Sequence, residues 1–443
     1  MTLDYESHRQ ATPWRSSKKY RALITLSDQG IVSLTTFATI WLFNRWLLPD
    51  ASRFEQGLYS LIYASVWVFA REILNSLVST PHTILVPTRK GDALRRINGS
   101  ALLHHFALGA LITFGLAMAA LGYWFAGKTH YFWLFAAAVF ATPPLLLWNF
   151  LRQWCFALRR MELAWAMDLS VSALTFAGLI LLNSQGHLQA STIVLAVGFA
   201  NLIPTAVVLI LIRREFAPGI REAKDDARAT WITARWLLGS SMVWAAGLYL
   251  YPWLITSARG ESDAGVYSYC FTLAGLANPL LFAVQNWLGP HIAQAFVGRT
   301  SRDFRRYVYR SAWGFALFMS PMAILMAVLS DPLLRILQPT YASHSATVSL
   351  LALAMIPQAM SFALSRGLFS LGRASLDLAA NVVPIIVFLA AGVLLVRHYG
   401  PEGAAASMLF AQLSGATFRL IAFARIARQD KPIVETDVPP QTA

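Results

Sequence analysis

Charged side chains within long apolar stretches are the residues of this sequence best placed to do chemistry. Arg71 and Glu72 lie near the middle of one such stretch, with Asn75 about one turn further on, and Asp28 lies near the start of another. A charge in an apolar environment is costly, and in a membrane such residues usually bind ions or charged substrates. These four residues are therefore the first candidates for a functional site.

Arg71 and Glu72 are neighbours in sequence, so on a helix their side chains point about 100° apart and do not simply neutralise each other. Three serines share helical spacing with Glu72: Ser65, Ser76 and Ser79. We expect this polar face to line a cavity, with Arg71 and Asn75 binding substrate and Glu72 coupling an ion. The alternative is an ion pair with another helix that only fixes the packing.

Asp28 stands beside a polar stripe made by Gln29, Ser33 and Thr36. An acid in this position can bind a coupling proton or sodium ion. It can equally accept hydrogen bonds near the start of a helix, where a negative charge meets the positive end of the helix dipole. The sequence leaves both roles open for Asp28.

Four arginines lie near the ends of apolar stretches: Arg152, Arg235, Arg366 and Arg419. Taken singly, each is expected to extend its guanidinium toward the lipid headgroups. Taken together, they could surround an inner vestibule and attract an anionic headgroup, because one guanidinium group can bind two phosphate oxygens at once. Arg152 and Arg366 are accordingly candidate substrate-binding residues.

Motifs for other chemistry are missing from the sequence. It has no Gly-x-x-x-x-Gly-Lys-Ser/Thr loop for ATP, no His-Glu-x-x-His motif and no Gly-x-Ser-x-Gly motif. The two cysteines, Cys155 and Cys270, lie in apolar stretches, which argues against a disulfide framework or a cysteine-based zinc site. We expect no cofactor, no metal site and no enzymatic activity.

The elements that position these residues are expected to be membrane-spanning helices. Of the 443 residues, 56% are hydrophobic and only 13% are charged, about half the charged share of a soluble domain. A helix needs about 20 mostly apolar residues to cross a bilayer. Twelve such stretches can be drawn, at residues 23–47, 57–86, 100–125, 131–153, 163–182, 191–212, 230–256, 264–289, 309–329, 344–369, 376–396 and 402–424.

The distribution of basic residues tests this number of spans independently. Lys and Arg concentrate in the N-terminal tail, in every second loop and in the C-terminal tail, whereas the other loops hold only Arg53, Lys128, Arg259, Arg335 and Arg397. Basic residues favour the cytoplasmic side, so both termini are predicted to be cytoplasmic. This orientation signal accounts for most of the net charge of +14 and leaves no reason to expect nucleic-acid binding.

The longest and most charged connection divides the chain into two halves. The predicted parts are a basic cytoplasmic tail (1–22), an N-terminal six-helix bundle (23–212), a cytoplasmic linker (213–229), a C-terminal six-helix bundle (230–426) and a cytoplasmic tail (427–443). The loops on the outer side are all short. An enzyme that polymerises or ligates lipid-linked sugars usually needs a sizeable catalytic outer loop, so that class is disfavoured.

Short repeated motifs indicate an internal duplication. Gly57-Leu58-Tyr59-Ser60 recurs as Gly265-Val266-Tyr267-Ser268 at an offset of 208 residues. Pro144 and Arg160 recur as Pro357 and Arg373 at an offset of 213. The predicted fold class is therefore an all-α polytopic membrane protein of about 12 transmembrane helices, in two six-helix bundles related by a pseudo-twofold axis along the membrane normal.

Three segments resemble the bacterial polysaccharide-unit flippases, which translocate O-antigen and exopolysaccharide units. They are Leu26 to Ser33, Glu55 to Tyr59, and Gly400 to Ala405. That family belongs to the superfamily that also holds the multidrug and toxin extrusion carriers. The resemblance implies alternating-access transport of an undecaprenyl-diphosphate-linked oligosaccharide through a cationic cavity, with Arg71 as a buried cation.

The leading hypothesis is therefore a flippase for a lipid-linked repeat unit in surface polysaccharide biosynthesis. The alternative is an ion-coupled antiporter of small molecules or drugs with the same fold. The expected location is the bacterial cytoplasmic (inner) membrane. Expected partners are the undecaprenyl-diphosphate-linked glycan and membrane lipid, together with a polysaccharide polymerase and a chain-length regulator that such flippases work beside.

Overall fold

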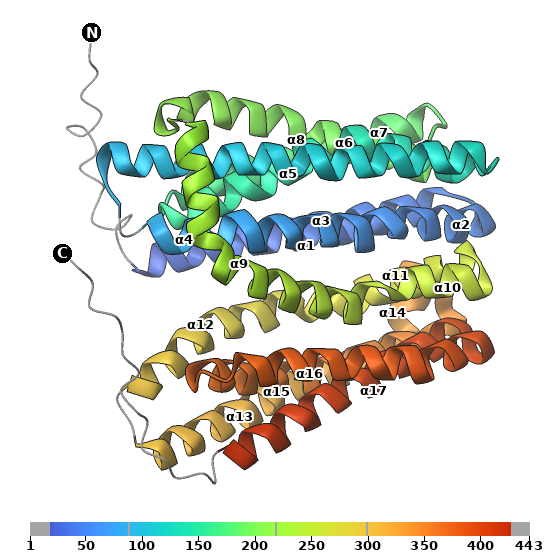
Figure 1. Ribbon diagram of the computed structural model, residues 1–443. Coiled ribbons are helices and arrows are strands. Elements are labelled where there is room, and N and C mark those ends of the chain that lie inside the picture. The colour runs from blue at the N-terminus through green and yellow to red at the C-terminus, as the bar shows by residue number, and fades with distance from the viewer. Residues whose placement is uncertain (1–17, 87–88, 218, 298–299, 427–443) are drawn as a thin grey trace. The chain divides into compact units, whose positions relative to one another are not determined.

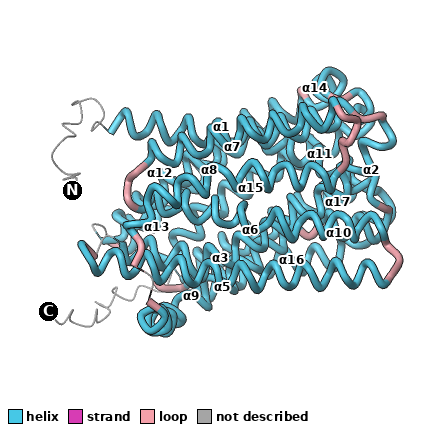
Figure 2. Tube along the Cα trace, turned by 90° about the horizontal axis from the view of Figure 1, so that it is seen from above, coloured by secondary structure: helices cyan, strands magenta, loops and turns pink. Residues whose placement is uncertain are grey.

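The computed structural model describes residues 18–86, 89–217, 219–297 and 300–426. Within these ranges the chain forms helices joined by short loops and contains no strand (Figure 2). The predicted tails, apart from residues 18–22, lie outside the described residues. The all-helical fold class predicted from the sequence is confirmed.

The first half of the chain holds helices α1 to α8. Their bounds are α1 (Lys18–Trp46), α2 (Pro49–Ser60), α3 (Trp67–Leu74), α4 (Thr80–Leu85), α5 (Gly91–Phe125), α6 (Thr129–Ala157), α7 (Met161–Ser184) and α8 (Ala190–Ile212). Two π-helical turns, Leu61–Val66 and Asn75–Ser79, connect α2 to α3 and α3 to α4. The second predicted span is therefore one helical segment with two local widenings, a feature that is frequent near functional sites.

The second half holds helices α9 to α17. Their bounds are α9 (Ile220–Tyr249), α10 (Tyr251–Arg259), α11 (Glu261–Ala274), α12 (Asn278–Val297), α13 (Ser301–Val328), α14 (Ser330–Leu337), α15 (Ser345–Ser370), α16 (Ala374–Val387) and α17 (Val393–Ile426). A π-helical turn, Phe388–Gly392, joins α16 to α17. The backbone kinks at Gly400 inside α17, where φ is 58° and the following residue is Pro401. This kink separates the eleventh and twelfth predicted spans.

Each of the twelve predicted spans corresponds to a helical segment. Among the described residues, nine segments are long and apolar enough to cross a membrane, and one of them, Ser375–Ile426, contains the last two predicted spans. The first predicted span falls on α1, and the seventh falls on the second part of α9 and on α10. The protein is a polytopic all-α membrane protein.

Internal contacts divide the chain into two compact units. The first contains Met1–Thr39 and Leu74–Ala234, and the second contains Ile40–Ile73 and Arg235–Ala443. The end of α1 and the start of the second span thus group with the C-terminal half, which the predicted boundary at 213–229 did not anticipate. The proposed division into two six-helix bundles remains a prediction.

Within the first unit, α5 to α8 run alongside one another (Figure 1). Small residues allow the closest of these contacts. A Cβ added to Gly198 of α8 would lie only 2.5 Å from the Cα of Ala141 in α6. Close approach at glycine and alanine is the usual way in which membrane helices pack.

Within the second unit, a buried polar cluster fixes the segment Ile40–Ile73. The Asn44 amide nitrogen donates to Gln56 Oε1 at 2.9 Å, and Asn44 Oδ1 accepts from Ser52 and from the hydroxyl of Tyr341, both at 2.7 Å. Gln338 donates to the Asn44 carbonyl at 3.1 Å. Because all of these groups are buried, losing any one would leave an unsatisfied polar atom.

The predicted duplication appears in the second unit as a reciprocal contact between α2 and α11. A Cβ on Gly57 would lie 1.9 Å from the carbonyl oxygen of Glu261, and a Cβ on Gly265 would lie 2.0 Å from that of Arg53. Both pairs are related by the offset of 208 residues. Reciprocal contacts of this kind are what an approximate twofold axis between two helices produces.

The second offset, 213 residues, relates two turns that share their backbone hydrogen bonds. The turn after α6 has bonds from Leu158 N to Trp154 O, Arg159 N to Phe156 O and Arg160 N to Cys155 O. The turn after α15 has the corresponding bonds from Leu371, Gly372 and Arg373. Arg159 and Gly372 both have positive φ, at 58° and 67°. The two halves therefore use the same local fold at this point.

Candidate ion-coupling site

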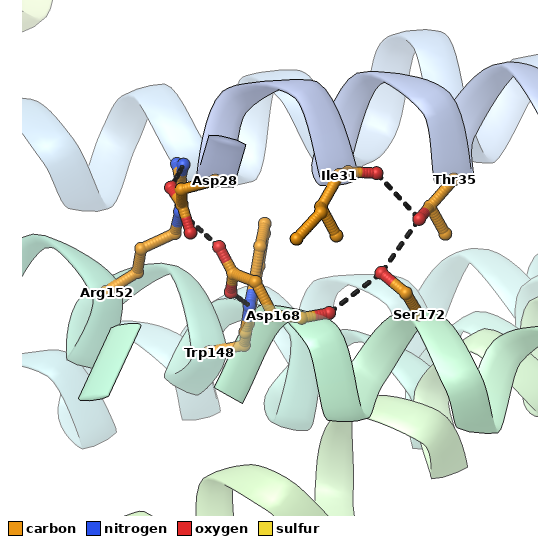
Figure 3. Close-up of polar contacts among 7 residues, drawn as sticks. All are labelled: Asp28, Ile31, Thr35, Trp148, Arg152, Asp168 and Ser172. Carbon is orange, nitrogen blue, oxygen red and sulfur yellow. Dashed lines mark hydrogen bonds and ion pairs between the residues drawn. The ribbon is translucent and has the colours of Figure 1, made fainter. Parts of the chain in front are cut away.

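A cluster of two acids and one arginine forms in the first unit, where α1, α6 and α7 meet. Arg152 of α6 donates from Nη2 to Asp28 Oδ2 of α1 and from Nε to Asp168 Oδ2 of α7, the latter at 2.7 Å. Figure 3 shows the guanidinium between the two carboxylates. The structure therefore brings two candidates from the sequence, Asp28 and Arg152, into direct contact, and a further acid, Asp168, binds the same guanidinium.

The turn between α6 and α7 explains why Arg152 and Asp168 meet. Arg152 stands eight residues before Arg160 and Asp168 stands eight residues after it. Arg152 lies five residues before the end of α6 and Asp168 lies seven residues after the start of α7, about 8 and 10 Å along the two helices, so the two side chains are at a similar level of the helix pair. Because the turn is tight and hydrogen-bonded, it fixes this register.

The cluster is shielded from solvent within the protein. Asp28 and Asp168 are each 1% exposed, and the side chain of Arg152 is 12% exposed. The guanidinium lies over two aromatic rings, 5.1 Å from the ring centre of Phe156 and 5.8 Å from that of Trp148. Such contacts add cation–π attraction to the ion pairs.

The two carboxylates differ in their hydrogen bonding. Asp168 Oδ1 accepts a hydrogen bond from Trp148 Nε1 at 2.6 Å, so both of its oxygens are occupied. Asp28 Oδ1 is buried and has no hydrogen-bond partner among the described residues. This oxygen is a candidate position for a further cation or proton.

Charge balance leads to the same conclusion. Two ionised carboxylates and one guanidinium carry a formal net charge of −1, and an uncompensated buried charge is expensive. One additional monovalent cation, a proton or a sodium ion, would neutralise the cluster. The arrangement can therefore take up and release a single positive charge.

Further polar contacts attach α1 to α7 beside the cluster. Thr35 Oγ1 lies 2.7 Å from Ser172 Oγ, which donates to the Asp168 carbonyl at 2.8 Å. Trp165 Nε1 donates to Ser27 Oγ at 3.1 Å. Asp28 and Asp168 thus have such contacts on both sides, which hold the two carboxylates near one guanidinium; Figure 3 shows the contact between Thr35 and Ser172.

Asn75 lies elsewhere in the first unit. Its Oδ1 accepts from Asn149 Nδ2 at 2.8 Å, in a contact between the second π-helical turn and α6. Asn149 is one residue after Trp148, which contacts the acid cluster. Asn75 is half-buried, and its amide nitrogen retains donor capacity for a ligand.

Arg71 and Glu72 lie in α3 and belong to the second unit. Both are half-buried, and Arg71 Nε lies 3.3 Å from the carbonyl oxygen of Trp67. The polar face predicted around Glu72 is more enclosed than expected. Ser65 is 1% exposed and donates to the Tyr249 carbonyl at 2.6 Å, while Ser76 and Ser79 are each 4% exposed. These three serines are buried in this structure, and the prediction that their face lines a cavity stays a prediction.

The four arginines near helix ends fall into two groups. Arg235 and Arg366 are exposed, with their guanidinium groups over Trp236 and Phe362 at 5.6 Å and 5.0 Å from the ring centres. Arg419 is instead 7% exposed and donates to Asp377 at 2.9 Å and to Asn381. The expectation that each would extend to the headgroups is wrong for Arg152 and Arg419, because buried acids face both.

Asp168 and Asp377 are the residues that the sequence analysis missed. Both lie in otherwise apolar stretches, so the rule that singled out Asp28 and Glu72 applies to them equally. The repeat gives a second signal, because Asp168 corresponds to Asn381 at the offset of 213 residues. Asp168 bonds to Arg152 and Asn381 bonds to Arg419, so each half pairs an arginine with the same helix position.

No protein-family model and no curated protein sequence matches this chain. Solved structures do match. An inward-facing multidrug resistance MATE family transporter of the MOP superfamily superposes with a TM-score of 0.72 at 12% identity, covering 93% of this chain and 100% of that one. The lipid II flippase MurJ in an inward closed conformation gives 0.67 at 14% identity, covering 93% and 90%.

A third match is the MATE transporter VcmN of Vibrio cholerae, with a TM-score of 0.61 at 14% identity, covering 93% of this chain and 97% of that one. Similarity at this level of identity establishes the fold. The chain has the fold shared by the MATE transporters and the flippase MurJ.

Proposed function

We propose that the chain is an ion-coupled flippase that moves a polyprenyl-diphosphate-linked oligosaccharide repeat unit across the cytoplasmic membrane by alternating access. The observation that carries this proposal is the buried Asp28–Arg152–Asp168 cluster, set in a fold shared with transporters and a lipid II flippase. The fold supplies a precedent for a lipid-linked substrate, and the cluster supplies a site for one coupling cation.

Asp28 is proposed as the ion-coupling residue of the cluster. Its Oδ1 is buried and without a partner among the described residues, whereas both oxygens of Asp168 accept hydrogen bonds. A cation at Asp28 would weaken its attraction for Arg152. The α1 helix would then lose one of its ties to α6, which gives the cation a way to change the conformation. Glu72 remains a second candidate for this role.

The proposed substrate contacts are Arg71, Arg366 and Asn75. The guanidinium groups of Arg71 and Arg366 suit the diphosphate, and the amide of Asn75 suits a sugar hydroxyl. Arg152 was also a substrate-binding candidate, but its Nε and Nη2 both serve acids. We therefore assign Arg152 to ion coupling in this proposal.

The alternative is an ion-coupled antiporter of small molecules or drugs. One MATE structure superposes with a TM-score of 0.72 and another with 0.61, on either side of the 0.67 for MurJ, so the fold comparison favours neither function. The proposed cationic contacts, Arg71 and Arg366, favour the flippase, because a phosphorylated substrate needs positive charge. An antiporter of cationic drugs is expected to have acids at its substrate contacts.

The cellular setting is part of the proposal. The flippase would act in the bacterial inner membrane, with both termini in the cytoplasm, as the distribution of Lys and Arg predicts. Its product at the outer face would be used by a polysaccharide polymerase, with a chain-length regulator setting the final size of the O-antigen or exopolysaccharide.

The test is mass spectrometry of undecaprenyl-linked sugars in cells that lack the chain, compared with complemented cells. The proposal expects accumulation of one complete repeat unit and loss of surface polysaccharide. Complementation with Asp28→Asn should fail, whereas the matched Asp92→Asn should succeed, because the Asp92 side chain is 79% exposed. A normal lipid-linked pool with altered drug sensitivity would instead identify an antiporter.

A further inference from the structure

A basic pocket of about 420 Å³ lies on α13, far along the chain from the acid cluster. Six residues line it: Arg302, Arg305, Arg306, Tyr309, Arg310 and Trp313. Their spacing of three and four residues places all of them on one face of the helix. The face holds four guanidinium groups, a phenol and an indole, and no acid.

Three of the four arginines on this face have no acid that balances their charge among the described residues. Arg302, Arg306 and Arg310 are exposed, and among the described residues no carboxylate is in ion-pair contact with them. The carboxylate of the nearest acid in sequence, Asp303, accepts a hydrogen bond from the Thr300 hydroxyl at 2.8 Å, and Thr300 caps the helix by accepting from the Asp303 backbone N–H. The pocket therefore presents an excess of positive charge.

The position of these arginines on the helix is also unfavourable without an anion. Arg302 lies in the first turn of α13, where the helix dipole is positive, and Arg306 and Arg310 follow at the next two turns. Arg302, Arg306 and Arg310 are four residues apart, so like charges are adjacent along one face. An anion held between them would relieve both the mutual repulsion and the interaction with the dipole.

The same face of α13 continues as an apolar, exposed surface. Beyond Trp313, which is 60% exposed, come Leu317 at 73% and Ile324 at 52%. Aromatic side chains mark the boundary between lipid headgroups and acyl chains. A ligand that matches the whole face has a phosphate at the arginines and hydrocarbon chains along Leu317 and Ile324.

We propose that this pocket binds the phosphate headgroup of an anionic phospholipid from the leaflet predicted to be cytoplasmic. Guanidinium groups bind phosphate oxygens in pairs, and the indole of Trp313 suits the glycerol level of the lipid. A free phosphate would use only the arginines and would gain nothing from the apolar surface. This inference does not depend on the proposed transport function.

The test is native mass spectrometry of the purified full-length chain, titrated with phosphatidylglycerol and with phosphatidylcholine. The variant Arg302→Gln/Arg306→Gln/Arg310→Gln should lose phosphatidylglycerol affinity by roughly fivefold per arginine, on the order of 100-fold in total. Arg306→Gln alone, expected to lose about fivefold, covers the case in which the triple variant misfolds. Binding of phosphatidylcholine should be weak and unchanged.

A matched variant controls for overall charge. Arg89→Gln/Arg96→Gln/Arg221→Gln removes three exposed arginines from the side predicted to be cytoplasmic and leaves the pocket intact. It should keep wild-type affinity. Equal losses of phosphatidylglycerol affinity in the two triple variants would overturn the proposed lipid site, because they would show a general effect of charge.

Two competing ligands separate the sources of the phosphate. Inorganic phosphate should displace little of the bound phosphatidylglycerol. Undecaprenyl diphosphate should displace no more of it than other lipids do. If undecaprenyl diphosphate bound at these arginines and phosphatidylglycerol did not, the phospholipid assignment would be wrong.

Discussion

Arg152 and Asp168 face each other across α6 and α7 at 2.7 Å, each eight residues from Arg160 in the turn between the helices. This pairing presents a guanidinium to Asp28 on α1, and Arg152 thereby becomes the shared partner of two buried acids. The cluster combines a fixed pair on adjacent helices with one acid from a helix distant in sequence. In the proposed coupling, a cation would bind at Asp28 while the Arg152–Asp168 pair stays in place.

Replacement of the central arginine should be the most damaging change in the cluster. Arg152→Ala leaves two buried carboxylates without a counter-charge, so we expect a loss of about 3–5 kcal/mol of stability. Arg152→Lys keeps the charge but not two separate donor directions, and should lose less. Thermal unfolding in detergent measures both. An Arg152→Ala variant as stable as wild type would show that the ion pairs do not support the fold.

Substitutions of Asp28 and Asp168 should have different effects. Asp28→Asn should retain most of the stability and lose coupled transport, because Asp28 carries the free oxygen. Asp168→Asn should lose stability as well, since Asp168 accepts from both Arg152 and Trp148. The comparison combines unfolding temperature with the lipid-linked sugar pool in complemented cells. Identical behaviour of the two variants would argue against distinct roles.

The reciprocal glycine contact predicts symmetric effects of two distant substitutions. Gly57→Ala and Gly265→Ala each place a Cβ within about 2 Å of a backbone oxygen, so each should cost about 1–3 kcal/mol. Gly314→Ala is the matched control, because no atom lies within 4 Å of its Cβ position. It should be neutral or slightly stabilising, as alanine favours helix. A tolerated Gly57→Ala variant would contradict the close α2–α11 contact.

The paired turns predict opposite effects of glycine and alanine. Arg159 adopts a φ of 58°, which glycine tolerates better, so Arg159→Gly should stabilise the chain by about 1 kcal/mol. Gly372→Ala at the repeated position should destabilise it by a similar amount. Chemical or thermal unfolding of both variants tests this. A loss of stability in Arg159→Gly would mean that the arginine side chain, and not the backbone, determines this turn.

The substrate contacts can be tested separately from coupling. Arg71→Gln and Arg366→Gln should each reduce export of the repeat unit, by tenfold or more if the guanidinium binds the diphosphate, since one charged hydrogen bond contributes about 1.5–3 kcal/mol. Arg235→Gln is the control, an exposed arginine over a tryptophan that the proposal does not use. Surface polysaccharide and the lipid-linked pool are the measured quantities. Normal export by both variants would show that neither Arg71 nor Arg366 is needed to bind the diphosphate.

Much of the fold could be predicted because spans and repeats are properties of sequence. Hydropathy located the twelve helical segments, and the motif beginning at Gly57 predicted the equivalence with Gly265 that the α2–α11 contact displays. Hydropathy and repeats do not determine how one helix is rotated against another. Ser65 therefore appeared to belong to a cavity-lining face, whereas its hydroxyl bonds to the backbone at Tyr249.

The acid cluster was predictable only in part for the same reason. Asp28 and Arg152 stood out as charges in apolar segments, but their partnership depends on how α1 packs against α6 and α7. Asp168 had the same signal as Asp28 and was overlooked. Once the turn at Arg160 is recognised, the equal separation in sequence of Arg152 and Asp168 from Arg160 would have suggested that the two side chains pair.

Reconstituted transport tests the central claim, that a cation at Asp28 drives translocation, most directly. Proteoliposomes containing a labelled lipid-linked oligosaccharide would be given a proton gradient or a sodium gradient, and the rate of movement between leaflets would be measured. One of the two gradients should accelerate translocation by wild type and by Asp92→Asn, and neither should accelerate it in Asp28→Asn. Equal acceleration in Asp28→Asn would contradict the account.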